Sequence, residues 1–200
     1  MARRLARAGR RVIIGSRASE SAEKAAAELG HGAVGLANAA AAAAGDIVIV
    51  TVPFSAQEAT LADIAPHVGD KIVVDTTVPL MPPKVMRVQL PPEGSAAQRA
   101  QKILGEGATL VSAFHNVAAH KLATDADIAC DVLVFGDDKD ARSKIVALAG
   151  EMGLRGLHGG ALANAAASEA MTSVLIFINK TYQVDGAGLM ITGPLAQSGE

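Results

Sequence analysis

The chain of 200 residues is long enough for one sizeable domain, and its composition narrows the possible classes of function. Half of the residues are apolar but only 2% are aromatic, which favours a core of Ala, Val, Ile and Leu, as in parallel strands covered by helices. The formal net charge of −2 disfavours partners such as nucleic acid or an anionic membrane surface.

The cellular setting is indicated by cysteine usage and by hydropathy. Cys130 is the only cysteine, so a disulfide within the chain is excluded and a reducing compartment is expected. We expect no signal peptide, and the longest strongly apolar run, Val174 to Ile178, is too short to span a bilayer. The sequence therefore predicts a cytoplasmic protein that binds neither nucleic acid nor a membrane.

Short apolar segments alternate with helical segments along the chain, which predicts an α/β fold with a mostly parallel sheet. Helices are expected at 2–8, 19–29, 39–44, 55–65, 95–105, 139–150 and 162–182, with a loop or a short helix in 114–124. Strands are expected at 12–15, 33–36, 46–51, 71–75, 109–113, 131–135 and 154–158.

Caps and prolines mark the boundaries of these elements. Asn38 is expected to cap the helix that follows it, and Asp137 or Asp138 is expected to cap the helix over 139–150. The segment 76–94 contains five prolines and connects a strand to a helix. Because it is longer than an ordinary connection, we expect it to serve a binding site.

The first predicted strand ends in Gly15, and Ser16 and Arg17 follow it. Ligands of doubly wound domains bind outside the carboxyl ends of the strands. On the strand that contacts the adenosine ribose, an acidic residue binds the 2′-hydroxyl of NAD, whereas an arginine accommodates the 2′-phosphate of NADP. The pair therefore predicts NADP. The alternative is a surface loop in which the serine caps a helix and the arginine is solvated, and these two residues alone do not decide.

Five short motifs occur in the order and spacing of a known protein family. They are Gly15-Ser16-Arg17, Val111-Ser112-Ala113-Phe114-His115-Asn116-Val117, Gly136-Asp137-Asp138, Leu162-Ala163-Asn164-Ala165 and Ala187-Gly188-Leu189-Met190-Ile191-Thr192-Gly193. Through them, nearly the whole chain resembles the NADPH-dependent F420 reductases, which transfer a hydride between NADP and the deazaflavin coenzyme F420.

The resemblance implies a Rossmann-like doubly wound sheet with a C-terminal helical extension, in a single domain over residues 1–200. Residues 1–113 would bind the dinucleotide, and residues 114–200 would complete the deazaflavin pocket. Family members begin with a strand and a glycine-rich turn that places the pyrophosphate at a helix N-terminus. Here the chain opens inside that helix, so we expect an N-terminally truncated fold in which strands 12–15 and 46–51 lack a shared neighbour.

The resemblance also implies roles for individual residues. Cofactor-binding residues would be Ser16 and Arg17 on the 2′-phosphate, Thr51, Val52, Pro53 and Ala56 near the nicotinamide ribose, Val78 beside the rings, and Ala119, whose backbone would lie near the carboxamide. Residues of the deazaflavin pocket would be Pro79, His115, Asn116 and Met190.

Hydride transfer between two cofactors requires no acid or base from the protein, so we name no catalytic residue. His115 and His120 could suggest a metal pair, but zinc sites require three or four ligands and we expect no metal site. His115 is then a pocket wall or a buried core histidine. A homodimer is expected.

Two other functions stay open. One is an NADP-dependent reductase that uses another acceptor, such as a flavin or a ferric chelate. The other is a non-catalytic, nucleotide-binding remnant, which the departure at the start of the chain favours.

Overall fold

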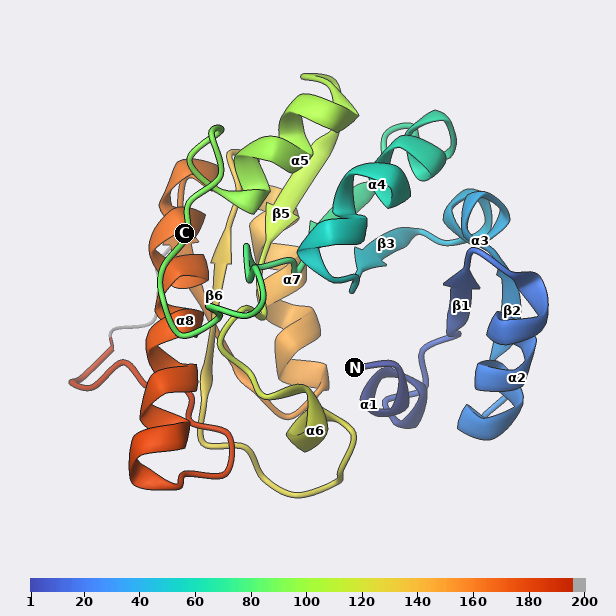
Figure 1. The fold of residues 1–200 in the computed structure, drawn as a ribbon. Helices are drawn as coiled ribbons and strands as arrows, with labels where there is room; N and C mark the ends of the chain where they lie inside the picture. The colour runs from blue at the N-terminus through green and yellow to red at the C-terminus, as the bar shows by residue number, and fades with distance from the viewer. Residues whose placement is uncertain (196–200) are drawn as a thin grey trace.

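The strands form two separate sheets in a computed structural model that describes residues 1–195 (Figure 1). A two-stranded parallel sheet contains β1 (Ile13–Ser16) and β2 (Val34–Ala37). A five-stranded sheet has the order β3 (Ile47–Val50), β4 (Ile72–Asp75), β5 (Thr109–Ser112), β6 (Asp131–Phe135) and β7 (Arg155–Gly160). Its neighbouring strands are parallel except for β5 and β6, which are antiparallel.

Helices connect and cover the strands. They are α1 (Ala2–Arg7), α2 (Ser19–Leu29), α3 (Asn38–Ala44), α4 (Phe54–Val68), α5 (Ala96–Leu104), α6 (Ala119–Leu122), α7 (Lys139–Glu151), the 3₁₀ turn η1 (Leu162–Asn164) and α8 (Ala165–Tyr182). The predicted α/β fold is confirmed, and the predicted separation of the strands at 12–15 and 46–51 is also found, because β1 and β3 belong to different sheets.

Two details of the predicted caps are wrong or refined. Asn38 does not cap α3: it is the first residue of that helix, and its side chain makes no capping bond. Asp138 is the cap of α7, since its carboxylate accepts a hydrogen bond from the backbone N–H of Ala141 at 2.7 Å. Asp137 has a different function and accepts a bond from the N–H of Leu162, which joins the start of η1 to the end of β6.

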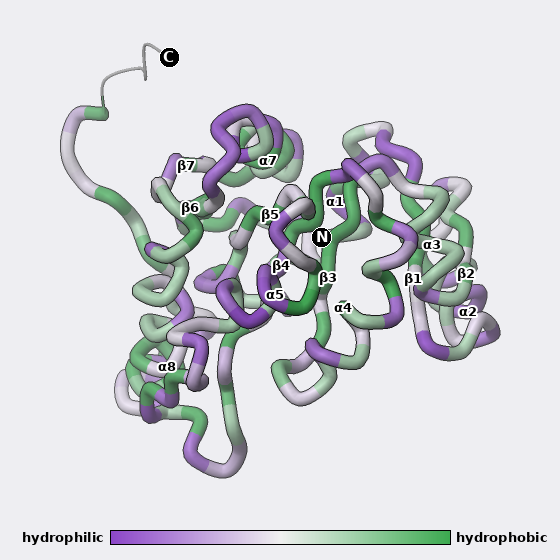
Figure 2. The backbone as a smooth tube through the Cα atoms, turned by 90° about the horizontal axis from the view of Figure 1, so that it is seen from above, coloured by the Kyte–Doolittle hydropathy of each residue, from purple (hydrophilic) through white to green (hydrophobic). Residues whose placement is uncertain are grey.

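The five-stranded sheet has an apolar core on each face, because successive side chains of a strand point to opposite faces. On β4, Val74 belongs to one core with Ile145 of α7, whereas Val73 belongs to the other core with Leu61 of α4. All four side chains are fully buried. Figure 2 shows that hydrophobic segments lie along the central strands of this sheet. All four residues of β4 are buried, whereas in β3, at the edge of the sheet, only Val50 is buried.

The β1–β2 unit, which comprises β1, α2 and β2, has a much smaller core. Its fully buried apolar side chains among the described residues are Ala22 and Ala26 of α2. Gly35 of β2 lies so close to α2 that an added Cβ would be 2.2 Å from the backbone of Ala22 and Glu23. The unit is therefore held together by close backbone packing around a glycine rather than by large side chains.

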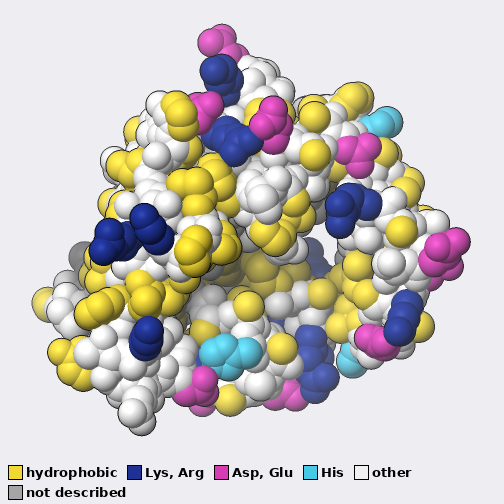
Figure 3. All heavy atoms as spheres, viewed as in Figure 1, with side chains coloured by type: hydrophobic (Ala, Val, Ile, Leu, Met, Phe, Trp, Pro, Cys, Tyr) yellow, Lys and Arg dark blue, Asp and Glu magenta, His cyan; other side chains and the backbone are white. Residues whose placement is uncertain are grey.

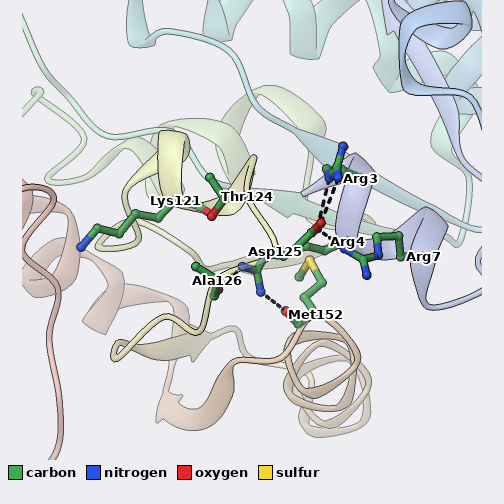
Figure 4. A network of polar contacts seen from close by, with 8 residues as sticks. All are labelled: Arg3, Arg4, Arg7, Lys121, Thr124, Asp125, Ala126 and Met152. Carbon is green, nitrogen blue, oxygen red and sulfur yellow. Dashed lines mark hydrogen bonds and ion pairs between the residues drawn. The ribbon is translucent and has the colours of Figure 1, made fainter.

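Helix α1 is attached to the five-stranded part of the molecule (Figure 4). Arg3 binds both carboxylate oxygens of Asp125, at 3.1 and 2.9 Å, and Arg7 also pairs with Asp125. Arg4 donates to the carbonyl oxygens of Ala126, at 2.6 Å, and of Met152, at 2.8 Å. The first helix is thereby fixed to the loop before β6 and to the end of α7.

The segment Leu162–Tyr182 is long and apolar enough to cross a membrane, with 21 residues and a mean hydropathy of 1.2. Length and composition alone are weak evidence, because a core helix of a folded domain meets the same criteria. The side of α8 that faces the domain carries buried polar residues, Ser168, Glu169 and Ser173. Each of them is hydrogen-bonded to another element of the domain.

Candidate functional site

The carboxyl ends of β3, β4 and β5 are joined at one edge of the sheet, as expected for parallel neighbours. Beyond the ends of the ladder, Thr76 donates to the carbonyl oxygen of Val50 through its N–H at 3.1 Å and its hydroxyl at 3.0 Å. On the other side, the N–H of Ala113 donates to the carbonyl oxygen of Asp75 at 3.1 Å. The turns that follow the three strands therefore form one continuous edge, which we call the carboxyl edge.

Most of the predicted cofactor-binding residues follow these strands directly. Thr51 and Pro53 are exposed after β3, Val52 and Ala56 are half-buried, and Val78 is half-buried in the segment after β4. The predicted pocket residue Pro79 is buried beside Val78. Figure 3 shows a deep hollow in this face of the molecule, surrounded by hydrophobic side chains.

The turn after β5 is locked in place by His115 and its neighbours. Phe114 has a left-handed backbone with φ of 67°, which reverses the chain so that the ring of His115 lies 2.8 Å from the hydroxyl of Ser112. Burial lowers the pKa of His115 to about 3, so the ring is neutral at physiological pH. Its other ring nitrogen, Nδ1, has no hydrogen-bond partner within the described part of the chain.

Asn116 attaches the same turn to α8. Its amide donates to the carbonyl oxygen of Ser168 at 2.9 Å, and its oxygen accepts from the hydroxyl of Ser168 at 2.6 Å. Thr172, one turn further along α8, donates to the carbonyl oxygen of His115 at 3.1 Å. His115 and Asn116 are both buried, so their side chains are held in place by packing and hydrogen bonds.

Met190 is 55% exposed, in the segment after α8. Its neighbour Leu189 accepts a bond from the N–H of Asp131 at 2.7 Å, so the segment runs along the start of β6. Gly188 is required there, because a Cβ would lie 2.6 Å from the sulfur of Cys130. Beside this contact is a cavity of about 400 Å³, lined by residues of 116–130 and 185–188. Asn116 lines this cavity, whereas Pro79, His115, Ala119 and Met190 do not.

Ser16 and Arg17 lie apart from the carboxyl edge, at the end of β1 in the other sheet. Arg17 is exposed and makes no ion pair or side-chain hydrogen bond with residues 1–195 of the structure, so its guanidinium is available to an anionic group. Helix α3 contacts both β1 and α4, and is the element that links this end of β1 to the five-stranded part.

A buried polar network beneath the carboxyl edge was not predicted. Gln57 of α4 donates from its side-chain amide to the carboxylate of Asp75 at 2.5 Å and to the carbonyl oxygen of Ala96 at 3.0 Å. The other carboxylate oxygen of Asp75 accepts from the N–H and the hydroxyl of Thr77. Glu169 of α8 accepts from the N–H groups at the start of α5.

Both carboxyl groups of this network are destabilised as anions by burial. Desolvation raises the pKa of Asp75, against the hydrogen bonds from Thr77 and Gln57. Burial likewise raises the pKa of Glu169 to about 7, partly opposed by its bonds from the N–H groups of Ala97 and Ala96. One signal in the sequence could have revealed the network: Glu169 is the single acidic residue within the apolar segment 162–182.

No cluster of three or more His, Cys, Asp or Glu side chains suited to a metal ion occurs in the part of the chain that the structure describes. His120 is paired with the carboxylate of Asp185 at 2.9 Å on the surface. It belongs to no such ligand cluster among the described residues. The alternation of strands and helices, with a free arginine at a strand end and a polar carboxyl edge, defines a nucleotide-binding α/β domain of the Rossmann type.

Comparison with known proteins identifies the family. Residues 1–79 match the family model described as NADP oxidoreductase, coenzyme F420-dependent. An F420-dependent NADP reductase of Methanothermobacter thermautotrophicus is 40% identical over 205 residues, covering 96% of this chain and 88% of the relative. One of Methanocaldococcus jannaschii is 36% identical over 207 residues, covering 96% and 92%. The chain belongs to the F420-dependent NADP reductase family, and the predicted resemblance is confirmed.

A solved structure confirms the fold independently. The crystal structure of a candidate F420-dependent NADP reductase from Arthrobacter sp. FB24 superposes with a TM-score of 0.84 at 24% sequence identity. The superposition covers 96% of this chain and 93% of that protein. The likeness therefore extends over both the β1–β2 unit and the five-stranded sheet.

Proposed function

We propose that this protein transfers a hydride between NADP(H) and coenzyme F420. The observation that carries the proposal is membership of the F420-dependent NADP reductase family at 40% identity over nearly the whole chain. The residues also fit an NADP phosphate, because the hydroxyl of Ser16 and the free guanidinium of Arg17 both donate hydrogen bonds to anionic oxygens.

When bound, NADP and F420 supply the two carbon atoms between which the hydride moves. The protein's contribution is then to bind, to orient the rings and to exclude water. Val78 and Pro79 would flank the rings, and the buried His115 and Asn116 would form a rigid wall. A neutral His115 suits this role, since it offers no proton to a reaction that needs none.

We propose the remaining binding roles from the same placement. Thr51, Val52, Pro53 and Ala56 would contact the nicotinamide ribose at the end of β3. Ala119, the first residue of α6, would present its N–H to the carboxamide. Met190 would cover the deazaflavin from the C-terminal segment.

The test of the proposed function is titration of NADPH combined with an assay of F420 reduction. Arg17→Ala should weaken NADPH binding by roughly 10- to 100-fold and leave NADH binding unchanged, because a charge-assisted bond to phosphate contributes about 1.5 to 3 kcal/mol. The matched control is Arg11→Ala, which removes an exposed arginine at the other end of the strand. An equal loss of NADPH affinity in the two variants would contradict the proposal. F420 reduction that does not depend on NADPH would contradict it as well.

The alternative is a chain that binds NADP without transferring a hydride. One observation favours it: in the described residues, Arg17 and Thr51 follow strands of two sheets that are not hydrogen-bonded to each other. NADPH binding without reduction of F420, of a flavin or of a ferric chelate would support this alternative. Reduction of a flavin or ferric chelate in place of F420 would instead identify a different acceptor.

We further propose a cytoplasmic homodimer. Helix α8 carries exposed apolar side chains on its outer side, among them Val174 at 41% and Phe177 at 53% exposure. A second copy of the chain would cover this stripe. Phe177→Glu should convert a dimer into a monomer in sedimentation experiments, and a monomeric wild-type chain would contradict the proposal. The buried free thiol of Cys130 suits a reducing compartment.

A further inference from the structure

A chain of buried hydrogen bonds runs from α8 to the segment after β4. It begins at Glu169, whose two carboxylate oxygens accept from the N–H groups of Ala96 at 2.6 Å and Ala97 at 2.9 Å. These are orphan N–H groups of the first turn of α5, where the helix dipole favours a negative group. Glu169 is 1% exposed, so the contact fixes the position of α5 relative to α8 without competition from water.

The next hydrogen bonds of the chain are donated by Gln57. Its side-chain amide donates both to the carbonyl oxygen of Ala96 and to the carboxylate of Asp75, so the start of α5 and the end of β4 share one donor. Both partners are acceptors, which fixes the orientation of the amide. Gln57 is fully buried and directly follows Ala56, one of the residues proposed to face the nicotinamide ribose.

The last hydrogen bonds of the chain join Asp75 to Thr77, next to the proposed ring-flanking residues. Asp75 accepts from the N–H of Thr77 at 3.1 Å and from its hydroxyl at 2.6 Å. Thr77 is 2% exposed and immediately precedes Val78 and Pro79. The backbone entering Val78 is therefore held by a side chain whose own position depends, through Gln57, on the first turn of α5.

Burying two carboxyl groups in this way is costly for stability. Their presence is explained if they specify a geometry, because all four carboxylate oxygens of Asp75 and Glu169 accept hydrogen bonds, which restricts the alternative arrangements of the network. Oε1 of Gln57 has no hydrogen-bond partner among the described residues. The segment 76–94 contains no helix or strand, so it has no ladder of its own to fix Val78.

We propose that Glu169 is a positioning residue for hydride transfer, acting through α5, Gln57 and Asp75 to hold Thr77 and the Val78–Pro79 segment against the reacting rings. The proposal rests on the proposed function. It assigns to α8 a role in the reaction in addition to its role in packing. Displacement of the ring-flanking segment lowers the rate more than the affinity, because reaction depends more steeply on geometry than binding does.

The experiment measures kcat and KM for NADPH-dependent F420 reduction in four variants of the whole chain. Glu169→Gln keeps the size but loses one of the two acceptors, and Thr77→Val removes the hydroxyl donor at the other end. The double variant tests their coupling. Asp138→Asn is the matched control, since it weakens a carboxylate cap on α7, far along the chain from this network.

We expect Glu169→Gln to lower kcat roughly 10-fold with KM for NADPH changed less than about 2-fold, and Asp138→Asn to change neither. The double variant should be no slower than the slower single variant, because both act on the same segment. Multiplied losses, or a Glu169→Gln variant that is folded and as fast as wild type, would overturn the positioning role. If Glu169→Gln does not fold, Thr77→Val with an unchanged kcat overturns it equally.

Hydrogen exchange separates failure of this inference from failure of the proposed function. Loss of an acceptor at Glu169 should speed exchange at the N–H of Thr77 at least several-fold while leaving β6 unchanged. If the wild-type protein transfers no hydride, the proposed function fails. Hydrogen exchange at Thr77 then tests by itself whether Glu169 holds that residue in place. Unchanged exchange at Thr77 in Glu169→Gln overturns it.

Discussion

The β1–β2 unit and the five-stranded sheet are both built from short strands of four to six residues, yet they are stabilised in different ways. In β4 every residue is buried, and its apolar side chains belong to two cores. In β1 the apolar Ile13 and Ile14 are only half-buried, and the close contact in the unit is made by Gly35. The proposed phosphate anchor therefore lies on the part with little buried apolar surface, whereas the proposed ring site lies on the part with the large cores, and we expect the first part to open more readily.

The largest expected effect comes from the core of the five-stranded sheet. Ile145 is fully buried on α7, so Ile145→Ala should lower the free energy of unfolding by about 2 to 5 kcal/mol. Leu36→Ala in β2 should cost about 1 kcal/mol, because Leu36 is half-buried and loses less apolar contact. Urea unfolding of both variants measures the difference. Equal losses in the free energy of unfolding would show that the cores of the two parts contribute equally to stability.

The second effect is a pH dependence that belongs to the five-stranded part. The pKa of Glu169 is raised from 4.5 to about 7 in the folded chain, so the folded state holds a proton that the unfolded state has released. The stabilisation is fully present below pH 4.5 and is lost as the pH rises through 7, by on the order of 3 kcal/mol. Glu169→Gln should remove the part of this fall that Glu169 causes, whereas the part from Asp75, whose pKa is also raised by burial, stays.

The comparison with Glu169→Gln is needed because His115 acts in the opposite direction. Its pKa is lowered from 6.5 to about 3, so its contribution is present above pH 6.5 and is lost as the pH falls. The wild-type chain and the Glu169→Gln variant share this effect of His115. It therefore cancels in the difference between their free energies of unfolding. A difference that does not change between pH 4.5 and about 8 would contradict the raised pKa of Glu169.

The third effect tests the β1–β2 unit by itself. Gly35→Ala forces a Cβ against the backbone of α2, which should destabilise the unit by roughly 1 to 3 kcal/mol and speed hydrogen exchange in β1 and β2. NADPH binding should weaken, while exchange in β4 and β5 should stay as in wild type. Gly107→Ala is the control, because a Cβ there meets nothing within 4 Å. Faster exchange throughout the chain would show that the two parts unfold together.

Much of the fold could be predicted from the sequence because its signals are local. The apolar runs at 47–50 and 72–74 and the alternation of strands with helices are visible in a single pass, and the strand over 131–135 was predicted with its observed bounds. The antiparallel pairing of β6 with β5 was not predicted, because it depends on how the chain returns after the turn at His115. The capping role assigned to Asn38 was wrong, because α3 begins one residue earlier than expected.

The candidate site was predicted less completely, since its polar network joins residues far apart in the chain. Arg17 at a strand end is a local signal, and so is His115 within its motif. Gln57 and Glu169 are separated by more than a hundred positions, and they are connected only through the backbone of Ala96, because α5 packs against both α4 and α8. Such a contact has no periodicity by which it could be found.

The separation of the two sheets has a consequence for the protein in concentrated solution. β1 and β3 each present one edge without a strand partner in the described chain. The segment from Ile47 to Val50 has only β-branched apolar residues, with neither a lysine nor a proline to block addition of a foreign strand. Intermolecular strand pairing at this edge would set the solubility of the protein, and the protein concentration at which turbidity begins would measure it.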